Sequence, residues 1–474
     1  MSQFIDTIII GAGAAGLAIS NLLQQDKNEF LCLESHRTPG GCAGYFSRGK
    51  FIFDAGATTL SGLKYQGPLS KFLEASGIEL NLRKVDPGLI ISLAKGDITR
   101  FSDQKSWIDE QQKIFKADFI PELWTEIEKA NELCWKLAEE SANFPPHNFS
   151  SALKLLSKKI PSKLRALPLL LKSFDDYFLK ELKISQEYRE MLDELLLIST
   201  QNTTRDTPAM MAVMGLSYPQ DTWYHEGGMK GFNDSLLLPI KDQILFGHKV
   251  TSIAKIKDFY HIQTSKGQFK SRRIISSIPT WNTQKLLDIK ITEEHQVQPW
   301  GALTAYFKVK LNSEIPLYHQ VHTKGISHSG SGSVFFSFCP KDDLSRSDGI
   351  YQTLTLSTHI RYQNYVNAIS ESRDMARVVW KNEFLKVVQD YLGTKLLDII
   401  PVGLGDPDTF IEYTERFNGL VGGIPHSMKR SPLNFSPKSP FKDLYQIGDT
   451  VFPGQGIVGV IQGAINLHQR IARV

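Results

Sequence analysis

Residues 7–23, TIIIGAGAAGLAISNLL, constrain the fold of this chain more than any other stretch. Residues 7–10 are a β-branched run, which is typical of a buried strand in a parallel sheet. A GxGxxG pattern follows, and then apolar residues continue at helical spacing. Gly11 permits a tight turn, Gly13 lets a pyrophosphate approach the backbone, and Gly16 lets the helix pack closely on the strand. The N–H groups at the start of that helix, at Ala14 and Ala15, would then meet the phosphate oxygens.

The context of this pattern makes it informative. A second match, GQGIVG at residues 454–459, follows Pro453 and has no acid at the right distance after it. The first match is followed by a second apolar strand, FLCLE, which ends at Glu34, 18 residues after Gly16, with Ser35 beside it. A carboxylate at that position accepts hydrogen bonds from the adenosine ribose. We therefore predict an α/β dinucleotide-binding domain; the alternative is a glycine-rich turn in an unrelated α/β domain.

The next loop favours FAD over a nicotinamide cofactor. Gly40 and Gly41 place a second flexible backbone segment where it could contact the pyrophosphate or the ribityl chain. An extended, buried cofactor uses such a segment, whereas a nicotinamide that comes and goes does not need it. Arg37 either offsets phosphate charge or lies on the surface. We find no second complete fingerprint for NAD(P)H.

Taken together, six motifs resemble the FAD-dependent carotenoid desaturases and cis–trans isomerases, the phytoene desaturase-like branch of the amine oxidase superfamily. They occur in the family's order: GAGAAG, Glu34, GG at 40–41, FDAG at 53–56, HEGGMKGF at 225–232 and IGDTVFPGQG at 447–456. The FPGQG form is most similar to the isomerase and oxidase side. The resemblance implies a main-chain contact from Val250 to the adenine.

From the resemblance, we expect the C-terminal motif to form the flavin end of the site. Residues 444–447 read as a strand that ends at Gly448 and Asp449, and the glycines after it begin the last helix. The resemblance implies that Asp449 holds a ribityl hydroxyl; the alternative is that it caps a helix or a turn. The helix start at Gly456 and Ile457 would face the flavin N1–C2=O edge, where free N–H groups stabilise negative charge.

We expect an α/β fold with a Rossmann-like, glutathione-reductase-type FAD domain that is split in the sequence. Its pieces are 1–100, 216–290 and 411–474. Residues 101–215 read as a helical insertion over the substrate cavity, or as a helical subdomain without a substrate role. Residues 291–410 read as a mixed-sheet substrate domain, with strands at "GALTAYFKVK", "GSVFFSFC" and "GIYQTLTLSTHI" and an amphipathic helix at 371–392.

Composition excludes several classes. The net charge of +4 is too small to indicate a nucleic-acid partner. The four cysteines form no CxxC pair, which indicates a reduced, cytoplasmic chain. The sequence shows no signal peptide and no run of ~20 apolar residues. No HExxH or GxSxG pattern is present, and we expect no metal site.

A basic, leucine-rich stretch at residues 151–172 suggests contact with a membrane surface. Pro161 and Pro168 divide it into short turns. The alternative is that its leucines pack inside the helical insertion while its lysines face water.

We therefore expect an FAD-dependent oxidoreductase that desaturates, isomerises or saturates a long apolar polyene or isoprenoid. The alternatives are an amine oxidase-like enzyme acting on a small amine, and a flavin- and lipid-binding protein without turnover. We assign no catalytic acid or base. Thr58, Thr59 and Leu60 are candidates to line the flavin face, and His225 is a candidate to reach the cavity.

Overall fold

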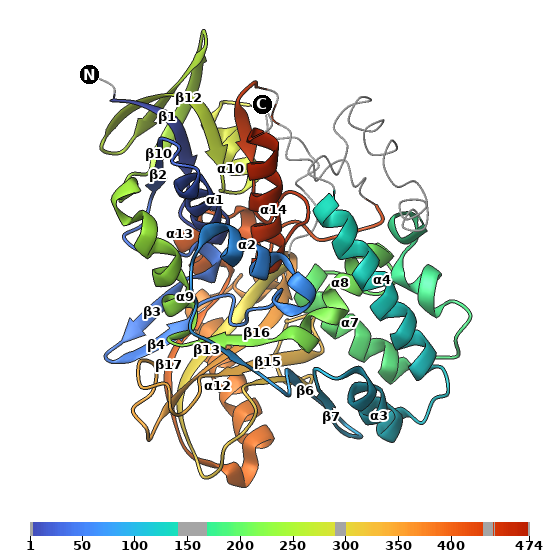
Figure 1. The fold of residues 1–474 in the computed structure, drawn as a ribbon. Coiled ribbons are helices and arrows are strands. Elements are labelled where there is room, and N and C mark those ends of the chain that lie inside the picture. The colour runs from blue at the N-terminus through green and yellow to red at the C-terminus, as the bar shows by residue number, and fades with distance from the viewer. Residues whose placement is uncertain (1–2, 141–167, 290–299, 430–438, 440, 473–474) are drawn as a thin grey trace.

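The computed structural model describes residues 3–140, 168–289, 300–429, 439 and 441–472. Figure 1 shows three parts: a sheet that holds the N-terminus, a second sheet at the opposite end, and a helical layer beside both. The expected α/β class, with a Rossmann-like sheet, a mixed second sheet and a helical insertion, is confirmed.

The first sheet is built from distant pieces of the chain. Its central strand pairs in parallel on both sides, with Ile8 opposite Ile274 on one neighbour and opposite Leu31 on the other. Alternate residues of this strand enter two separate apolar clusters, Ile9 on one face and Ile8 and Ile10 on the other. Burial on both faces explains the unbroken β-branched run. The strands are β1 (Gln3–Ile10), β2 (Phe30–Glu34), β9 (Ile244–Phe246), β10 (Val250–Ile256), β11 (Phe259–Thr264), β12 (Gly267–Ser276) and β18 (Leu444–Gln446).

Two details of this sheet differ from what the sequence pattern indicates. The alternation of residues 244–250 is typical of one strand, but Gly247 takes a positive φ of 69° and separates β9 from β10. The apolar stretch 272–279 is typical of a buried strand, but the strand begins earlier, at Gly267, and ends at Ser276. Helices cover one face of the sheet, with α14 packed against α1 and α2. They are α1 (Ala14–Gln25), α2 (Pro68–Ser76), α9 (Gly228–Leu237) and α14 (Gly456–Ile471).

The second sheet has one face toward the first sheet and one against helix α12 (Arg373–Leu392). Trp380, Phe384 and Val388 of α12 pack on its apolar back face. Its order is β17-β13-β16-β15-β14-β6-β7. The strands are β6 (Leu89–Leu93), β7 (Gly96–Arg100), β13 (Trp300–Leu311), β14 (Tyr318–His322), β15 (Ser333–Phe338), β16 (Gln352–Arg361) and β17 (Leu396–Gly405). The hairpin β6–β7 lies within the range 1–100 that we assigned to the cofactor domain, yet it extends this second sheet.

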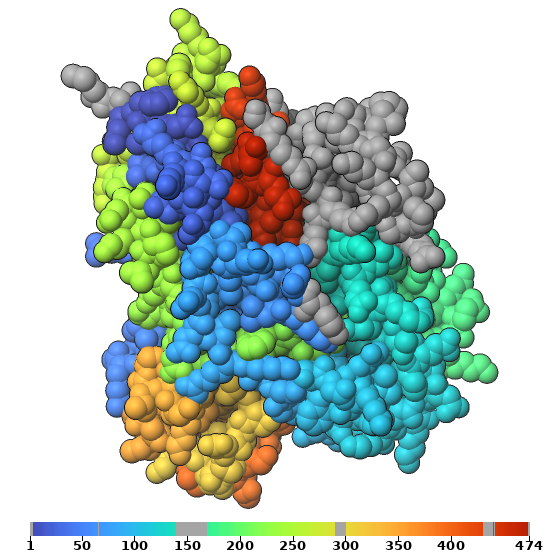
Figure 2. Space-filling model, viewed as in Figure 1, coloured from blue at the N-terminus to red at the C-terminus, as the bar shows by residue number. Residues whose placement is uncertain are grey.

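The helical layer contains α3 (Gln104–Phe115), α4 (Ile120–Glu140), α7 (Gln186–Thr200) and α8 (Ala209–Ser217). Its core includes Trp107, Trp124 and Tyr188, and the Trp124 indole N–H donates to the Tyr188 hydroxyl at 3.0 Å. In Figure 2 this layer stands to the right of α14. No described helix is long and apolar enough to cross a membrane.

Most of the basic stretch at 151–172 lies outside the described residues. At its described end, Leu169 is buried in the helical core, whereas Leu171 is 64% exposed. These two leucines therefore favour neither of the alternatives that the sequence left open.

Asp54 of the FDAG motif makes a buried ion pair with Arg346 and a hydrogen bond to the HEGGMKGF motif. Arg346 lies 2.9 Å from the carboxylate of Asp54, and both side chains are almost fully buried. The same carboxylate accepts the N–H of Met229 at the start of α9, at 2.9 Å. Both motifs thus serve to join the two sheets beside the site.

Candidate cofactor and substrate site

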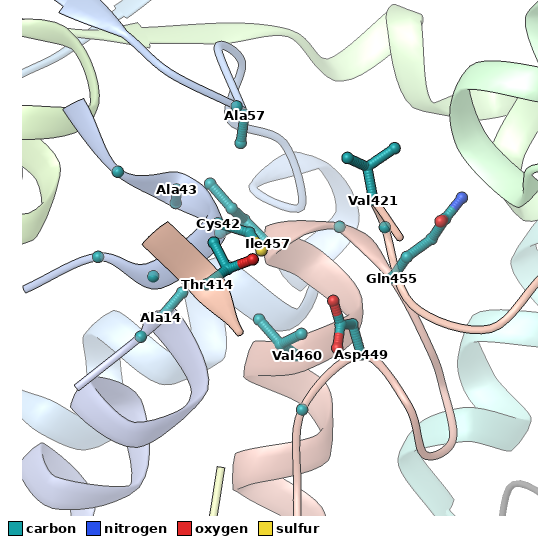
Figure 3. Close-up of a pocket in the computed structure, with 18 of the residues that line it drawn as sticks. Ala14, Cys42, Ala43, Ala57, Thr414, Val421, Asp449, Gln455, Ile457 and Val460 are labelled. Carbon is teal, nitrogen blue, oxygen red and sulfur yellow. The ribbon is translucent and has the colours of Figure 1, made fainter. Parts of the chain in front are cut away.

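A cavity of about 2090 Å³ lies between the two sheets and the helical layer. It is lined from both ends of the chain, and Figure 3 shows the meeting of the N-terminal and C-terminal segments. The predicted cofactor-binding residues line this cavity with the exception of Gly16: Gly11, Gly13, Ala14, Ala15, Glu34, Ser35, Gly40, Gly41, Val250, Gly448, Asp449, Gly456 and Ile457. That they bind a cofactor remains a prediction.

The glycines of the first loop have different roles. A Cβ atom on Gly16 would lie 1.9 Å from the carbonyl oxygen of Gly11, so this glycine is needed for the turn itself. A Cβ atom on Gly13 would meet no described atom closer than 3.9 Å, so the protein's own packing does not require glycine there. The open space over Gly13, at the N-terminus of α1, suits a ligand phosphate.

Glu34 is buried and joins the end of β2 to the glycine loop. One carboxylate oxygen accepts the N–H of Ala12 at 2.6 Å, and the other accepts the N–H of His36 at 2.8 Å. The carboxylate therefore holds the loop in place while it also lines the cavity. Arg37 is exposed and does not line the cavity. Of its two predicted roles, the structure therefore agrees with a surface arginine and not with one that offsets phosphate charge.

The Gly40–Gly41 loop lies directly beside the first loop. Gly40 donates its N–H to the carbonyl of Ala12 at 2.9 Å and forms a bridge with Gly13. The two backbone segments thus form adjacent walls of the cavity, and contact of Gly40 and Gly41 with a pyrophosphate or ribityl chain remains a prediction.

At the other end of the chain, Asp449 is paired with a cation that sequence reasoning missed. Arg416 Nη2 lies 2.7 Å from Asp449 Oδ2, and both residues line the cavity. Burial would lower the pKa of Arg416, but the Asp449 carboxylate outweighs that effect and the pKa is raised. Asp449 does not cap α14, because Gln455 occupies that N-cap position.

Two further candidates do not line the cavity. Leu60 is buried, and its backbone pairs with that of Trp223. Its neighbours Thr58 and Thr59 do line the cavity. His225 is 4% exposed, and its imidazole contacts Glu226 O and Ser235 Oγ instead. The expectations for Leu60 and His225 are therefore wrong, since both side chains pack into the protein.

The second sheet forms the floor of the cavity. Alternate residues of β13, β15 and β16 face it, while their neighbours pack against α12. The facing residues include several hydroxyls: Thr304, Tyr306, Ser333, Ser337, Thr355 and Ser357. Burial lowers the pKa of the nearby His359 and His426 to about 4, so both imidazoles are neutral at pH 7.

Sequence reasoning also missed Gln201 and Gln455, two residues that line the cavity. Isolated glutamines and a lone arginine in a loop carry no local pattern. The one available signal was that Arg416 falls within 411–474, a piece that the sequence assigns to the FAD domain. Among the described residues, no cluster of His, Cys, Asp or Glu could hold a metal ion, and all four cysteines are free.

Comparison with known proteins agrees with this geometry. Residues 9–76 match the model of an NAD(P)-binding Rossmann-like domain. A prolycopene isomerase named as chloroplastic, from an Oncidium hybrid cultivar, is 23% identical over 98% of this chain and 84% of its own length. The chain is a homologue of the prolycopene isomerases. The family resemblance of the six motifs is thereby confirmed.

Proteins of known structure share this fold at lower sequence identity. An oxidoreductase from Methanosarcina mazei is 16% identical and superposes with a TM-score of 0.65 over 98% of this chain and 100% of that chain. A putrescine oxidase is 15% identical, with a TM-score of 0.66 over 100% of this chain and 99% of that chain. This isomerase homologue therefore has the fold of amine oxidase-type oxidoreductases.

Proposed function

We propose that this protein is an FAD-dependent enzyme that acts on a double bond of a long polyene or isoprenoid. The observation that carries the proposal is the continuity of the cavity, which runs from the glycine loop to the floor formed by the second sheet. Its volume of about 2090 Å³ exceeds the ~300–1,000 Å³ of ordinary small-molecule pockets. It therefore has room for a dinucleotide and a long second molecule.

The residues present fit FAD. Gly13 leaves open space at the N-terminus of α1 for the pyrophosphate, and Glu34 lies at the end of β2, where the ribose would bind. Asp449 and the N-terminus of α14 lie across the cavity, where they would hold the ribityl chain and the flavin edge. Bound FAD would supply hydride or electron exchange with the substrate.

The chain's own residues would orient the substrate and exclude water. The helical layer covers one side of the cavity with Met211 and Met214, and Phe335 adds an apolar surface from β15. No acid or base is assigned, and the cation Arg416 is held by Asp449. The homology to prolycopene isomerases favours isomerisation over desaturation and saturation. Isomerisation involves no net oxidation of the substrate.

The test uses the FAD-loaded protein with a poly-cis carotenoid, in the oxidised state and after reduction with dithionite. We expect cis–trans conversion without a change of mass, and only in the reduced protein. Loss of two hydrogens with dioxygen or a quinone would indicate desaturation, and gain of two hydrogens would indicate saturation. No change in any polyene, with hydrogen peroxide produced from putrescine instead, would favour the amine oxidase alternative and overturn the proposal. No turnover of either substrate would favour a non-catalytic lipid-binding protein.

We further propose that the protein takes its substrate from a membrane surface in the cytoplasm through residues 151–172. The support is the composition of this stretch together with the poor solubility of a polyene in water. Flotation with anionic liposomes tests the proposal. Binding should decrease when Lys158, Lys159 and Lys163 are replaced by Glu, and wild-type protein that stays unbound would contradict it.

A further inference from the structure

Two buried amides meet at one point of the cavity wall. A methyl group built on Gly422 would lie 2.4 Å from Gln455 Oε1 and 2.7 Å from Gln201 Nε2. Gln201 follows α7 in the left-handed conformation, with φ of 57°, and Gln455 is the N-cap of α14. Residues 201, 422 and 455 are far apart in the sequence, so the fold brings these two amides together.

These amides have unused hydrogen-bonding capacity. Gln201 is 2% exposed, and its Oε1 atom is buried without a partner among the described residues. Both polar atoms of the Gln455 amide are likewise buried without a partner there. Burying an amide without a hydrogen bond is costly, and a cavity for a pure hydrocarbon would be better lined by leucine or methionine.

The Gln455 side chain points away from the dinucleotide loop. In Figure 3 it extends from the start of α14 away from Ala14 and Cys42, on the side of Val421. Its amide oxygen lies over Gly422 together with the amide of Gln201, the residue that directly follows α7. A ligand at this point would lie beside the end of α7, away from the pyrophosphate end of the cofactor.

The floor offers further hydroxyls in the same part of the protein. Ser357 lies opposite Phe335 and Thr304 on the neighbouring strands, and Ser337 lies opposite Thr355. Neither Ser337 nor Ser357 makes a side-chain hydrogen bond within the described residues, although both line the cavity. The floor can therefore also receive polar atoms.

We propose that the substrate carries a neutral oxygen group, a hydroxyl or a carbonyl, which Gln201 and Gln455 bind by hydrogen bonds. A glutamine amide donates hydrogen bonds through its N–H groups and accepts them through its oxygen. It can therefore both donate to and accept from a hydroxyl, and it can donate to a carbonyl. Because the two amides carry no charge, they suit a neutral oxygen better than a carboxylate. This inference rests on the proposed function and narrows its substrate class to oxygenated polyenes.

The test compares β-carotene with its 3,3′-dihydroxy derivative on the FAD-loaded protein, by binding and by turnover. A site that hydrogen-bonds a hydroxyl discriminates strongly against the analogue that lacks it. We expect the wild type to bind the dihydroxy compound at least tenfold more tightly. Gln201→Leu and Gln455→Leu should each abolish most of that preference by weakening the binding of the dihydroxy compound.

Two controls make the result specific. Met211→Leu changes the cavity wall without removing a hydrogen-bonding group, and it should keep the preference. The cofactor-free Gln201→Leu and Gln455→Leu variants should melt no earlier than the wild type, because each loses an unsatisfied buried amide. Equal binding of the two polyenes by the wild type would overturn the inference. So would a Gln455→Leu variant that keeps the preference but shows a weakened affinity for FAD.

Binding and turnover separate the two proposals. A tenfold binding preference without any turnover would support the oxygen site and contradict the enzymatic function. Turnover of both polyenes at equal efficiency, with equal binding, would support the enzyme and contradict the oxygen site.

Discussion

Arg416 donates Nη2 to the carboxylate of Asp449 across 2.7 Å, and this ion pair joins the segment after α13 (Pro407–Thr414) to the loop that leads into α14. The two side chains are only 8% and 14% exposed. From the sequence, Asp449 is expected to bind a ribityl hydroxyl. In the structure its carboxylate is already paired with the buried Arg416. The pair fixes the position of the carboxylate beside the cavity.

Asp449→Ala should therefore destabilise the cofactor-free protein, because it leaves Arg416 buried without its partner. Removing one member of a buried pair costs about 3–5 kcal/mol, whereas a surface pair is worth only ~0–1 kcal/mol. Urea unfolding of Asp449→Ala, Arg416→Met and the double variant measures the coupling. A loss below ~1 kcal/mol in Asp449→Ala would show that the pair behaves as a surface pair.

Gly13→Ala should weaken cofactor binding without destabilising the cofactor-free protein. The Gly13 Cβ meets no described atom within 3.9 Å, so the apo protein should keep its stability to within about 0.5 kcal/mol. Its FAD affinity should fall at least tenfold, because the methyl group occupies the pyrophosphate position. Thermal melting of the apo protein and FAD titration measure the two effects.

The Gly16→Ala variant serves as the matched comparison. Alanine in a helix is ordinarily better than glycine by ~1 kcal/mol. Here its Cβ would lie 1.9 Å from Gly11 O, and the resulting backbone shift should cost more, about 1–3 kcal/mol. If Gly16→Ala stabilises the apo protein, the close approach of helix and strand is not as described.

Glu34→Gln should weaken FAD binding by about 1–3 kcal/mol, because a charged acceptor for the ribose is lost. The neutral amide still offers one oxygen to the loop, so part of the contact with Ala12 N should survive. Fluorescence titration with FAD measures the change. Glu29→Gln, an exposed acid at the start of β2, is the control and should bind as the wild type does. Unchanged affinity in Glu34→Gln would remove this residue from the cofactor site.

Stability should decrease below pH 6.5 because of buried histidines. Burial lowers the pKa of His319 to about 4, and its ring contacts Tyr391 Oη and Pro316 O. Between pH 6.5 and 4 the unfolded chain binds a proton that the native protein does not, so the free energy of unfolding falls as pH falls. The slope is up to ~1.4 kcal/mol per pH unit for each such histidine.

Urea unfolding of the cofactor-free protein at several pH values between 7.5 and 4.5 measures this slope. His319→Gln should reduce it, whereas His328→Gln, at an exposed position, should not. A slope that is the same in wild type and His319→Gln would show that this imidazole is solvated in the native state.

The sequence predicted those parts of the fold whose signals are local. The strand, turn and helix at residues 3–25 follow from a β-branched run and three spaced glycines, and the walls of the site follow from glycine pairs. The hairpin β6–β7 could not be assigned, because β6 pairs with β14 more than 200 residues later. The amides of Gln201 and Gln455 escaped prediction for the same reason: only the tertiary fold brings them to Gly422.

The strand β18 joins the first sheet beside β12, and α14 packs on α1 at the opposite end of the chain. During synthesis on the ribosome, therefore, the glycine loop would emerge early but remain without its covering helix until residues 444–471 have left the exit tunnel. Contacts of such long sequence separation are slow to form, and the waiting segment exposes apolar surface. A nascent chain arrested before residue 444 should thus be retained by chaperones, and binding of the proposed FAD should follow only after release.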